Sequence, residues 1–275
     1  NLIIIEGIEN LKTDKADSFE GMFVDCEKLQ GTLNLSGWNT SKVTSFHHMF
    51  EDCYKLNGVN VSGWNTSKVT NVGRMFMRCV SLTELDLSSW DMSNVTEMRY
   101  MFSDCSSLQS VNVGNWNTSN VTSLAHVFSG CQSLRDVDVS HWNTDKVTSL
   151  VGMFAYCHSL QTLDLSSWKT SGVIYMGSMF KCCYQLTTIY CSDQWTNISA
   201  QSSEEMFMGS SNLVGGEGTT YDEVHLDATY ARIDGGPDAP GYLTANYIPI
   251  DQAHFPDRHF RDYLLWNSYG EDGIL

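Results

Sequence analysis

The stretch Ser81–Ser106, SLTELDLSSWDMSNVTEMRYMFSDCS, is one complete copy of a pattern that recurs along the chain. Leu82, Leu85 and Leu87 have the spacing of a leucine-rich repeat. This spacing predicts a short strand that directs Leu85 and Leu87 into a core and Asp86 outward. The following residues, SSWDMSNV, are rich in serine and asparagine, whose side chains favour turns. We therefore expect a strand followed by a reversal of the chain.

The second half of the unit carries an apolar stripe. Thr96 precedes Met98, Met101, Phe102 and Cys105, which have the spacing i, i+3, i+4, i+7. This spacing is typical of a short amphipathic helix, and the threonine hydroxyl is suited to cap its N-terminus. Each unit is therefore expected to pack one short helix onto one strand.

The unit repeats with a period of 26 residues. Tryptophan keeps this step at Trp38, Trp64, Trp90, Trp116, Trp142 and Trp168. Phenylalanine marks the successive passes at Phe23, Phe50, Phe76, Phe102, Phe128, Phe154, Phe180 and Phe207. Periods of this length indicate stacked units that cannot bury their apolar faces alone. The sequence predicts an α/β fold, namely a right-handed leucine-rich-repeat-like solenoid with a parallel concave sheet and short convex helices.

Stacking places equivalent residues in continuous rows. The predicted inward row consists of Leu35, Val61, Leu87, Val113, Val139, Leu165 and Cys191. A second row consists of Cys53, Cys79, Cys105, Cys131, Cys157 and Cys183, with Cys26 one residue out of step. Single cysteines one repeat apart lack the paired spacing of a zinc site, so we interpret them as small buried apolar residues. Because the chain has nine cysteines, at least one is not paired within it.

Three segments are expected. Residues 1–207 form the solenoid of about eight units, of which the first and last are degenerate. Residues 208–246, where the register fails, are expected to cap its apolar end. The predicted covering residues are Val224, Leu226, Tyr230, Ile233, Tyr242 and Leu243. Residues 247–275 resemble an amphipathic helix that opens a further leucine-rich array. The abrupt ends suggest that the chain is a fragment of a longer protein.

The composition narrows the class of partner. The net charge of −16 opposes nucleic-acid binding, which depends on basic residues that displace counterions from phosphates. No apolar stretch has the length of about 20 residues that a membrane-spanning helix requires. Residues 1–11 lack the features of a signal peptide, so any such peptide is expected to have been removed.

The outward face of the predicted sheet is the expected binding surface. Its candidate residues are Glu84, Asp86, Asn112, Arg135, Asp136, Asp138 and Asp164. Solenoids commonly recognise partners through such a face, although a solvated polar face without a ligand is the simpler alternative. Asp138 and Asp164 lie one repeat apart, so a calcium ion between them is a further, weaker alternative, as is a pair of glycosidase carboxylates.

The sequence does not point to an enzyme. Its eight histidines are scattered, and none lies in a recognisable motif with a nucleophile. We therefore assign no catalytic residue, no metal ligand and no cofactor. If an active site exists, the expected place is the 208–246 segment, around Asp222, His225 and Asp227.

The combination of three motifs resembles a known family. The unit LxxLDLSxWxxSxVTxMxxMFxxC, with the boxes MFEDC, MFMRC, MFSDC, VFSGC and MFAYC, is similar to the BspA-like leucine-rich-repeat surface proteins of bacteria. It most resembles the variant catalogued as a mycoplasma domain of unknown function, and the match covers roughly residues 2–207. The closing stretch LVGGEGTTYDEVHLDATYARIDGGPDAPGYLTA also resembles that family.

The resemblance implies an extracellular or surface-anchored protein that takes part in adhesion. Its implied partner is a protein or glycan, on a host matrix, a host cell or another bacterium. An inert spacer that displays other domains is the main rival. The resemblance assigns no functional residue in this sequence.

Overall fold

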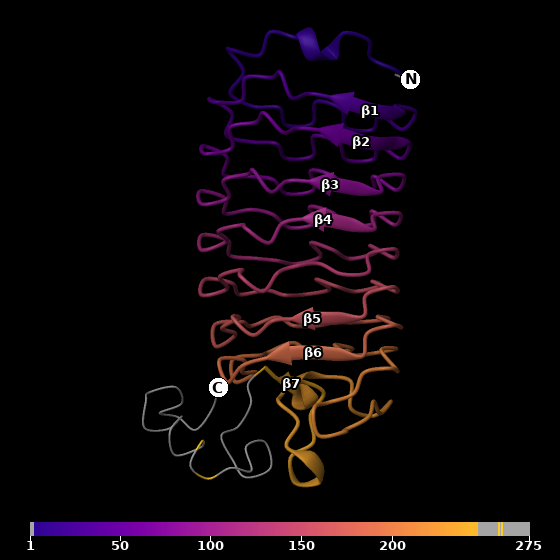
Figure 1. Ribbon diagram of the computed structural model, residues 1–275, viewed down its shortest axis with the longest axis vertical. Coiled ribbons are helices and arrows are strands. Elements are labelled where there is room, and N and C mark those ends of the chain that lie inside the picture. The colour runs from indigo at the N-terminus through magenta and orange to yellow at the C-terminus, as the bar shows by residue number, and fades with distance from the viewer. Residues whose placement is uncertain (1–2, 247–257, 259, 261–275) are drawn as a thin grey trace.

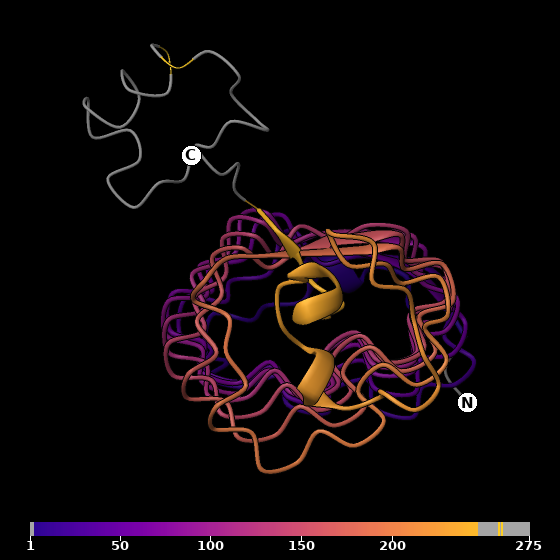
Figure 2. The same cartoon turned by 90° about the horizontal axis from the view of Figure 1, so that it is seen from below.

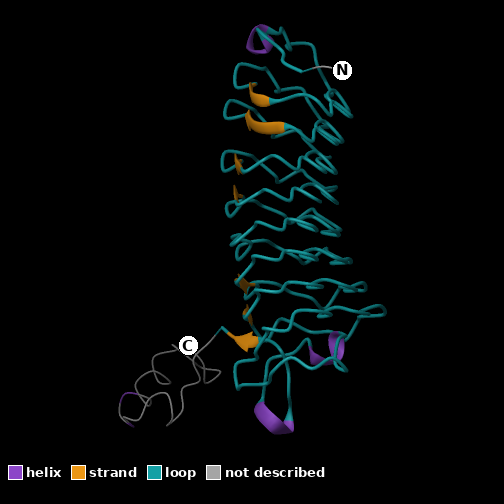
Figure 3. Cartoon of the chain, turned by 90° about the vertical axis from the view of Figure 1, so that its right-hand side faces the viewer, coloured by secondary structure: helices purple, strands orange, loops and turns teal. Residues whose placement is uncertain are grey.

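The chain forms a parallel β-solenoid with a repeat of about 26 residues in the computed structural model, which describes residues 3–246, 258 and 260. Successive coils stack along a nearly straight axis (Figure 1). The strands lie along one side of the stack, and turns make up the opposite side (Figure 3). The expected curvature is wrong, because the straight stack gives the sheet an open face and not the concave side of a horseshoe.

Short parallel strands mark the first half of most coils. They are β1 (Gly31–Asn34), β2 (Leu56–Asn60), β3 (Glu84–Asp86), β4 (Ser110–Asn112), β5 (Thr162–Asp164), β6 (Thr188–Cys191) and β7 (Thr244–Ala245). The pairs β1–β2, β3–β4, β5–β6 and β6–β7 are parallel. Three 3-10 helices complete the described elements, η1 (Ile8–Asn10), η2 (Ala228–Tyr230) and η3 (Gly236–Asp238). Residues 136–138 follow the same path between β4 and β5 without forming a regular strand.

The strands bury the residues that the sequence predicts. In β3, Leu85 is buried between the exposed Glu84 and Asp86, and it pairs in register with Val111 of β4. The inward row is confirmed, because each of its members is buried. These are Leu35, Val61, Leu87, Val113, Val139, Leu165 and Cys191.

The predicted convex helices are wrong, since residues 3–246 contain no α-helix. The segment that carries the apolar stripe forms a run of turns. The N–H groups of Tyr100, Phe102 and Asp104 donate to carbonyl oxygens of the next coil, at 3.1, 2.9 and 2.6 Å. The N–H groups of Met101, Ser103 and Cys105, which alternate with these, donate to the carbonyl of the residue three positions earlier. An α-helix would direct these groups to the residue four positions earlier within the same coil.

The turn run imitates the helical pattern because it repeats every four residues. Tyr100 and Asp104 both have a φ of 59°, in the left-handed region, and their counterparts in the other coils do the same. A four-residue repeat is close to the helical period of about 3.6, so Met98, Met101 and Phe102 face the core in either structure. The left-handed conformation is unfavourable for residues other than glycine. The hydrogen bonds between coils offset this cost.

Two aromatic columns fill the core. Neighbouring indoles from Trp38 to Trp142 are 5.8–6.5 Å apart between ring centres and nearly parallel. The indole N–H groups of this column bond across coils except that of Trp90, and Trp116 Nε1, for example, donates to the Leu87 carbonyl at 3.1 Å. The Phe102 and Phe128 rings are 5.4 Å apart and belong to the second column. The core is therefore continuous along the axis.

The residues after β6 cover the lower end of the stack. Figure 2 shows the chain around η2 and η3 crossing the end of the coils. Trp195 Nε1 donates to the Ala231 carbonyl at 3.0 Å, and the Phe207 and Tyr242 rings meet edge to face at 5.1 Å. Leu243 is also buried, whereas Val224 is exposed and covers nothing. The 247–275 segment, predicted as a helical opening, lies outside the described residues apart from 258 and 260.

Asp234 holds this terminal segment together. Its buried carboxylate accepts hydrogen bonds from the N–H groups of Glu217, Thr219 and Gly236 and from the Thr219 hydroxyl, at 2.7–3.0 Å. Burial opposes ionisation of Asp234, but these donors outweigh it and lower the pKa of the carboxyl below its usual value. The ionised side chain thus fastens the loop 217–219 to η3.

We expect Trp116→Ala or Phe102→Ala to lower the free energy of unfolding by about 3–5 kcal/mol, because each removes a fully enclosed ring from a column. Chemical denaturation measures the loss. Asn115→Ala, at an exposed neighbouring position, serves as the control and should change stability by less than about 0.5 kcal/mol. Equal stability of the three variants would contradict the described core.

We also expect Asp234→Asn to loosen the terminal segment at neutral pH, by about 1–3 kcal/mol, because it removes a charged acceptor from three backbone donors. The folded pKa of Asp234 is lowered, so its contribution is present above the unfolded value of about 3.9 and is lost as the pH falls through the folded value. Hydrogen exchange of the Thr219 amide measures it. The difference between the two proteins should therefore shrink under acidic conditions, and a constant difference would contradict this role.

Candidate binding face

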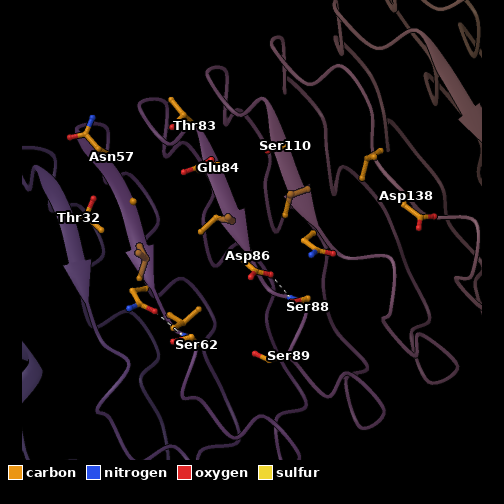
Figure 4. A pocket seen from close by; sticks show the side chains of 18 of the residues that line it. Thr32, Asn57, Ser62, Thr83, Glu84, Asp86, Ser88, Ser89, Ser110 and Asp138 are labelled. Atoms are coloured by element: carbon orange, nitrogen blue, oxygen red, sulfur yellow. Dashed lines mark hydrogen bonds between the residues drawn. The ribbon is translucent and has the colours of Figure 1, made fainter.

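A shallow groove of about 1010 Å³ runs over the outward face of the strands. It crosses five successive coils, from Thr32 on β1 to Asp138 beyond β4. Figure 4 shows Glu84 and Asp86 on β3, with Ser110 of β4 on one side and Asn57 of β2 on the other. The floor is flat because alternate strand residues, such as Leu85, turn inward.

The groove contains most of the predicted site. Five of the predicted residues line it, and they are Glu84, Asp86, Asn112, Asp136 and Asp138. Arg135 is exposed directly before Asp136 but is not part of the lining. Asp164 also lies outside it, one coil further along, where the amide of Asn246 donates to its carboxylate at 3.4 Å. The predicted residues Arg135 and Asp164 therefore lie beside the groove and not in its lining.

The aspartates of the groove also have a structural task. Asp86 Oδ1 accepts a hydrogen bond from the N–H of Ser88 at 3.1 Å, as seen in Figure 4. Asp138 Oδ1 accepts from both the N–H and the hydroxyl of Ser140, at 3.1 and 2.7 Å. These bonds to serine lower the pKa of both carboxyls. Each aspartate thus stabilises the turn after its strand and stays ionised at neutral pH.

The groove is strongly acidic. Glu84, Asp86, Asp136 and Asp138 contribute four carboxylates, and no lysine or arginine is among the described residues that line it. Charges of one sign in a depression concentrate counter-ions and attract groups of opposite charge. The arrangement can accept hydrogen bonds from a ligand at several points along its length.

The geometry gives little support to a calcium ion between Asp138 and Asp164. One oxygen of each carboxylate bonds to a serine, and Asn246 occupies a further position on Asp164. Within the described residues, no group of three or more histidine, cysteine or acidic side chains is arranged to hold a metal ion.

The cysteine row is buried, as predicted, and it has a polar function that the sequence analysis missed. Cys105 Sγ is 3.0 Å from the Phe76 carbonyl oxygen of the preceding coil, and the other members repeat this contact. Ser210 continues the row and donates to the Phe180 carbonyl. Burial raises the pKa of the Cys53 and Cys183 thiols to about 12. All nine cysteines are unpaired thiols.

We expect a thiol reagent such as iodoacetamide to modify only Cys26 and Cys182 in the folded chain at pH 8, since these two are half-buried and the other seven are buried. Mass spectrometry of the intact protein should show two additions before denaturation and nine after it. Rapid labelling of the buried row in the native state would contradict the closed core.

A buried ionic cluster on the turn side was also missed. Asp52 and Glu51 are both buried, and Arg78 bonds to the Asp52 carboxylate with N–O distances of 2.7 Å and lies 3.7 Å from Glu51. Arg74 and His48 also contact Glu51. The signal in the sequence was the exceptional charge of the box MFEDC. Because the charges pair with one another, we assign the cluster a structural role.

The residues named as a possible active site are partly brought together. His225 Nδ1 lies 3.1 Å from Asp222, and its ring stacks on Tyr230. Asp227 instead accepts the N–H of Thr229 at the start of η2. In the described part of the chain, no hydroxyl or thiol bonds to His225, so the pair lacks a nucleophile.

A family model described as "Mycoplasma protein of unknown function, DUF285" matches residues 3–111 and 97–216. No curated protein matches the chain. None of the helices in the described residues is both long and apolar enough to span a membrane.

Two solved structures are similar to the chain. One is a leucine-rich cell surface protein from Faecalibacterium prausnitzii A2-165, with 19% identity and a TM-score of 0.31 over 70% of this chain and 60% of that protein. The other is a leucine-rich-repeat protein from Bacteroides ovatus ATCC 8483, with 17% identity and a TM-score of 0.25 over 78% of this chain and 70% of that protein. The chain thus spans about 60% of the length of the F. prausnitzii protein.

Proposed function

We propose that this chain, which belongs to the family of Mycoplasma proteins of unknown function DUF285, is a non-enzymatic binding protein of the cell surface or the extracellular space. In this proposal, the groove on the sheet face binds a protein or a glycan outside the cell. One observation supports it most directly, namely the gathering of four carboxylates, with no lysine or arginine among the described lining residues, in a groove that crosses several coils. The name of the F. prausnitzii protein agrees with a surface location.

The chemistry of the groove favours a ligand that donates hydrogen bonds or carries positive charge. Asp86 and Asp138 each use one oxygen for the turn that follows, which leaves the other for a ligand. Asn112 adds an amide to the same row. Because the groove is open and long, it suits an extended segment such as a basic loop of a protein or a chain of sugar hydroxyls.

A structural spacer is the second candidate. It is supported by the hydrogen bonds that Asp86 and Asp138 accept from serine. These bonds stabilise turns, and they explain the polar residues at these positions without any ligand. A spacer would need the turns but not the charge of the groove. The two candidates can therefore be separated by removing charge while retaining the turns.

The test is a variant with Glu84→Gln, Asp86→Asn, Asp136→Asn and Asp138→Asn. Asparagine occupies the turn position at Asn34 and Asn60, where it accepts the same bond from a serine N–H, so the fold should persist. Binding to immobilised matrix proteins, mucins and glycans is measured by surface plasmon resonance. We expect the variant to lose at least about tenfold in affinity, since each close charge contact contributes 1 kcal/mol or more.

A matched control neutralises four exposed carboxylates elsewhere. These are Asp14, Asp91, Asp145 and Asp193. If both variants bind as the wild type does, the groove is not the site. If no probe binds the wild-type chain, the spacer is the better explanation.

A further inference from the structure

A second hollow, of about 560 Å³, lies over the turn runs of four successive coils. The turn runs face away from the strands (Figure 3), and the hollow shares no lining residue with the groove on the sheet. It is therefore a separate surface, and the function proposed for the sheet face does not account for it.

The hollow lies between two large side chains of a row that otherwise consists of serine and asparagine. Ser123 and Ser149 pair in register and form part of its lining, and Tyr175 is the next member of the same row. Glu97 occupies the equivalent position one repeat before Ser123. With coils about 4.8 Å apart, Glu97 and Tyr175 lie roughly 14 Å from each other along the axis. This length suits one or two sugar rings.

The aromatic rings of Tyr100 and His126, which line part of the hollow, are held in place by their neighbours. The Tyr100 and His126 rings stack with 4.7 Å between their centres, and the Arg74 guanidinium lies 5.2 Å from the Tyr100 ring centre on the preceding coil. His126 lies across Gly152, where a Cβ atom would come within 2.5 Å of the imidazole. The platform thus requires glycine at this point, and its rings are arranged before any ligand binds.

The acidic and basic side chains that line the hollow, Glu97 and Arg99, balance each other in charge. Arg99 Nε and Nη2 bond to Glu97 at 2.9 and 2.7 Å, so the guanidinium and carboxylate form a planar pair at one end. Burial lowers the pKa of His126, which is therefore neutral at pH 7. The hollow, unlike the sheet groove, attracts neither cations nor anions. A neutral ligand with both apolar and hydroxyl-bearing faces fits it best.

We propose that this hollow is a saccharide-binding site for one or two neutral pyranose rings. The apolar C–H face of a sugar ring packs on the exposed ring of Tyr175, while the Tyr100–His126 stack forms a rigid wall beside it. The hydroxyls bond to the planar Glu97–Arg99 pair, which offers both donors and acceptors. No bond is made or broken, and no cofactor takes part.

The probe is an array of neutral oligosaccharides that end in galactose, glucose, mannose or N-acetylglucosamine. Ligands are confirmed on the whole chain by saturation-transfer NMR. Tyr175→Ala should reduce affinity about tenfold or more, because it removes the stacking ring, whereas Tyr175→Phe should retain it. Gly152→Ala, which displaces His126, should also weaken binding while the melting temperature confirms that the chain is folded.

The matched control is Tyr156→Ala, which removes an exposed tyrosine outside the hollow. The proposal is overturned if no neutral sugar binds or if Tyr175→Ala binds as the wild type does. The sheet variant with four neutralised carboxylates should bind neutral sugars normally. Loss of sugar binding in that variant alone would place the sugar in the sheet groove and would overturn the second site.

Discussion

Every feature of this molecule depends on hydrogen bonds that the backbone of one coil donates to the next at a constant step. Phe50 donates to Met75, Phe76 to Met101 and Phe102 to Val127, each at 2.9 Å. Because the step does not change, equivalent side chains lie above one another in rows. Indole rings stack on indole rings, thiols contact the carbonyl oxygens of the preceding coil, and the core is continuous from coil to coil.

The same constraint decides where a surface can become specific. A row with the same residue in each coil gives a uniform surface, and a hollow arises only where neighbouring coils differ. On the turn side, serines between Glu97 and Tyr175 create such a place. On the sheet side, the row contains either Asn or Asp from Asn34 to Asp164, and acidic residues gather where Asp136 accompanies Asp138. Both candidate sites therefore lie at departures from the repeat.

The sequence predicted the features that depend on the period. The repeat length, the inward leucine and valine row and the burial of the cysteines all follow from which residues recur. The resemblance to the mycoplasma domain of unknown function agrees with the matching family model. The groove residues Glu84, Asp86, Asn112, Asp136 and Asp138 were also named, because alternation along a strand fixes which side chains face outward.

The helix was mispredicted for a definable reason. A four-residue series of turns and a helix bury the same positions, and only the destination of the N–H groups distinguishes them. That destination lies in another coil, so a single unit does not reveal it. The turn-side hollow, lined by Tyr100, His126 and Tyr175, was missed, since the sequence analysis named no candidate residue on this side of the solenoid.

The indole column has a consequence for how the molecule absorbs and emits light. From Trp38 to Trp142, neighbouring rings are about 6 Å apart and inclined by only 12–13°. At that separation, excitation passes between indoles much faster than it is emitted. The fluorescence of the folded chain therefore belongs to the column as a whole, and its polarisation depends on how many coils remain stacked without interruption.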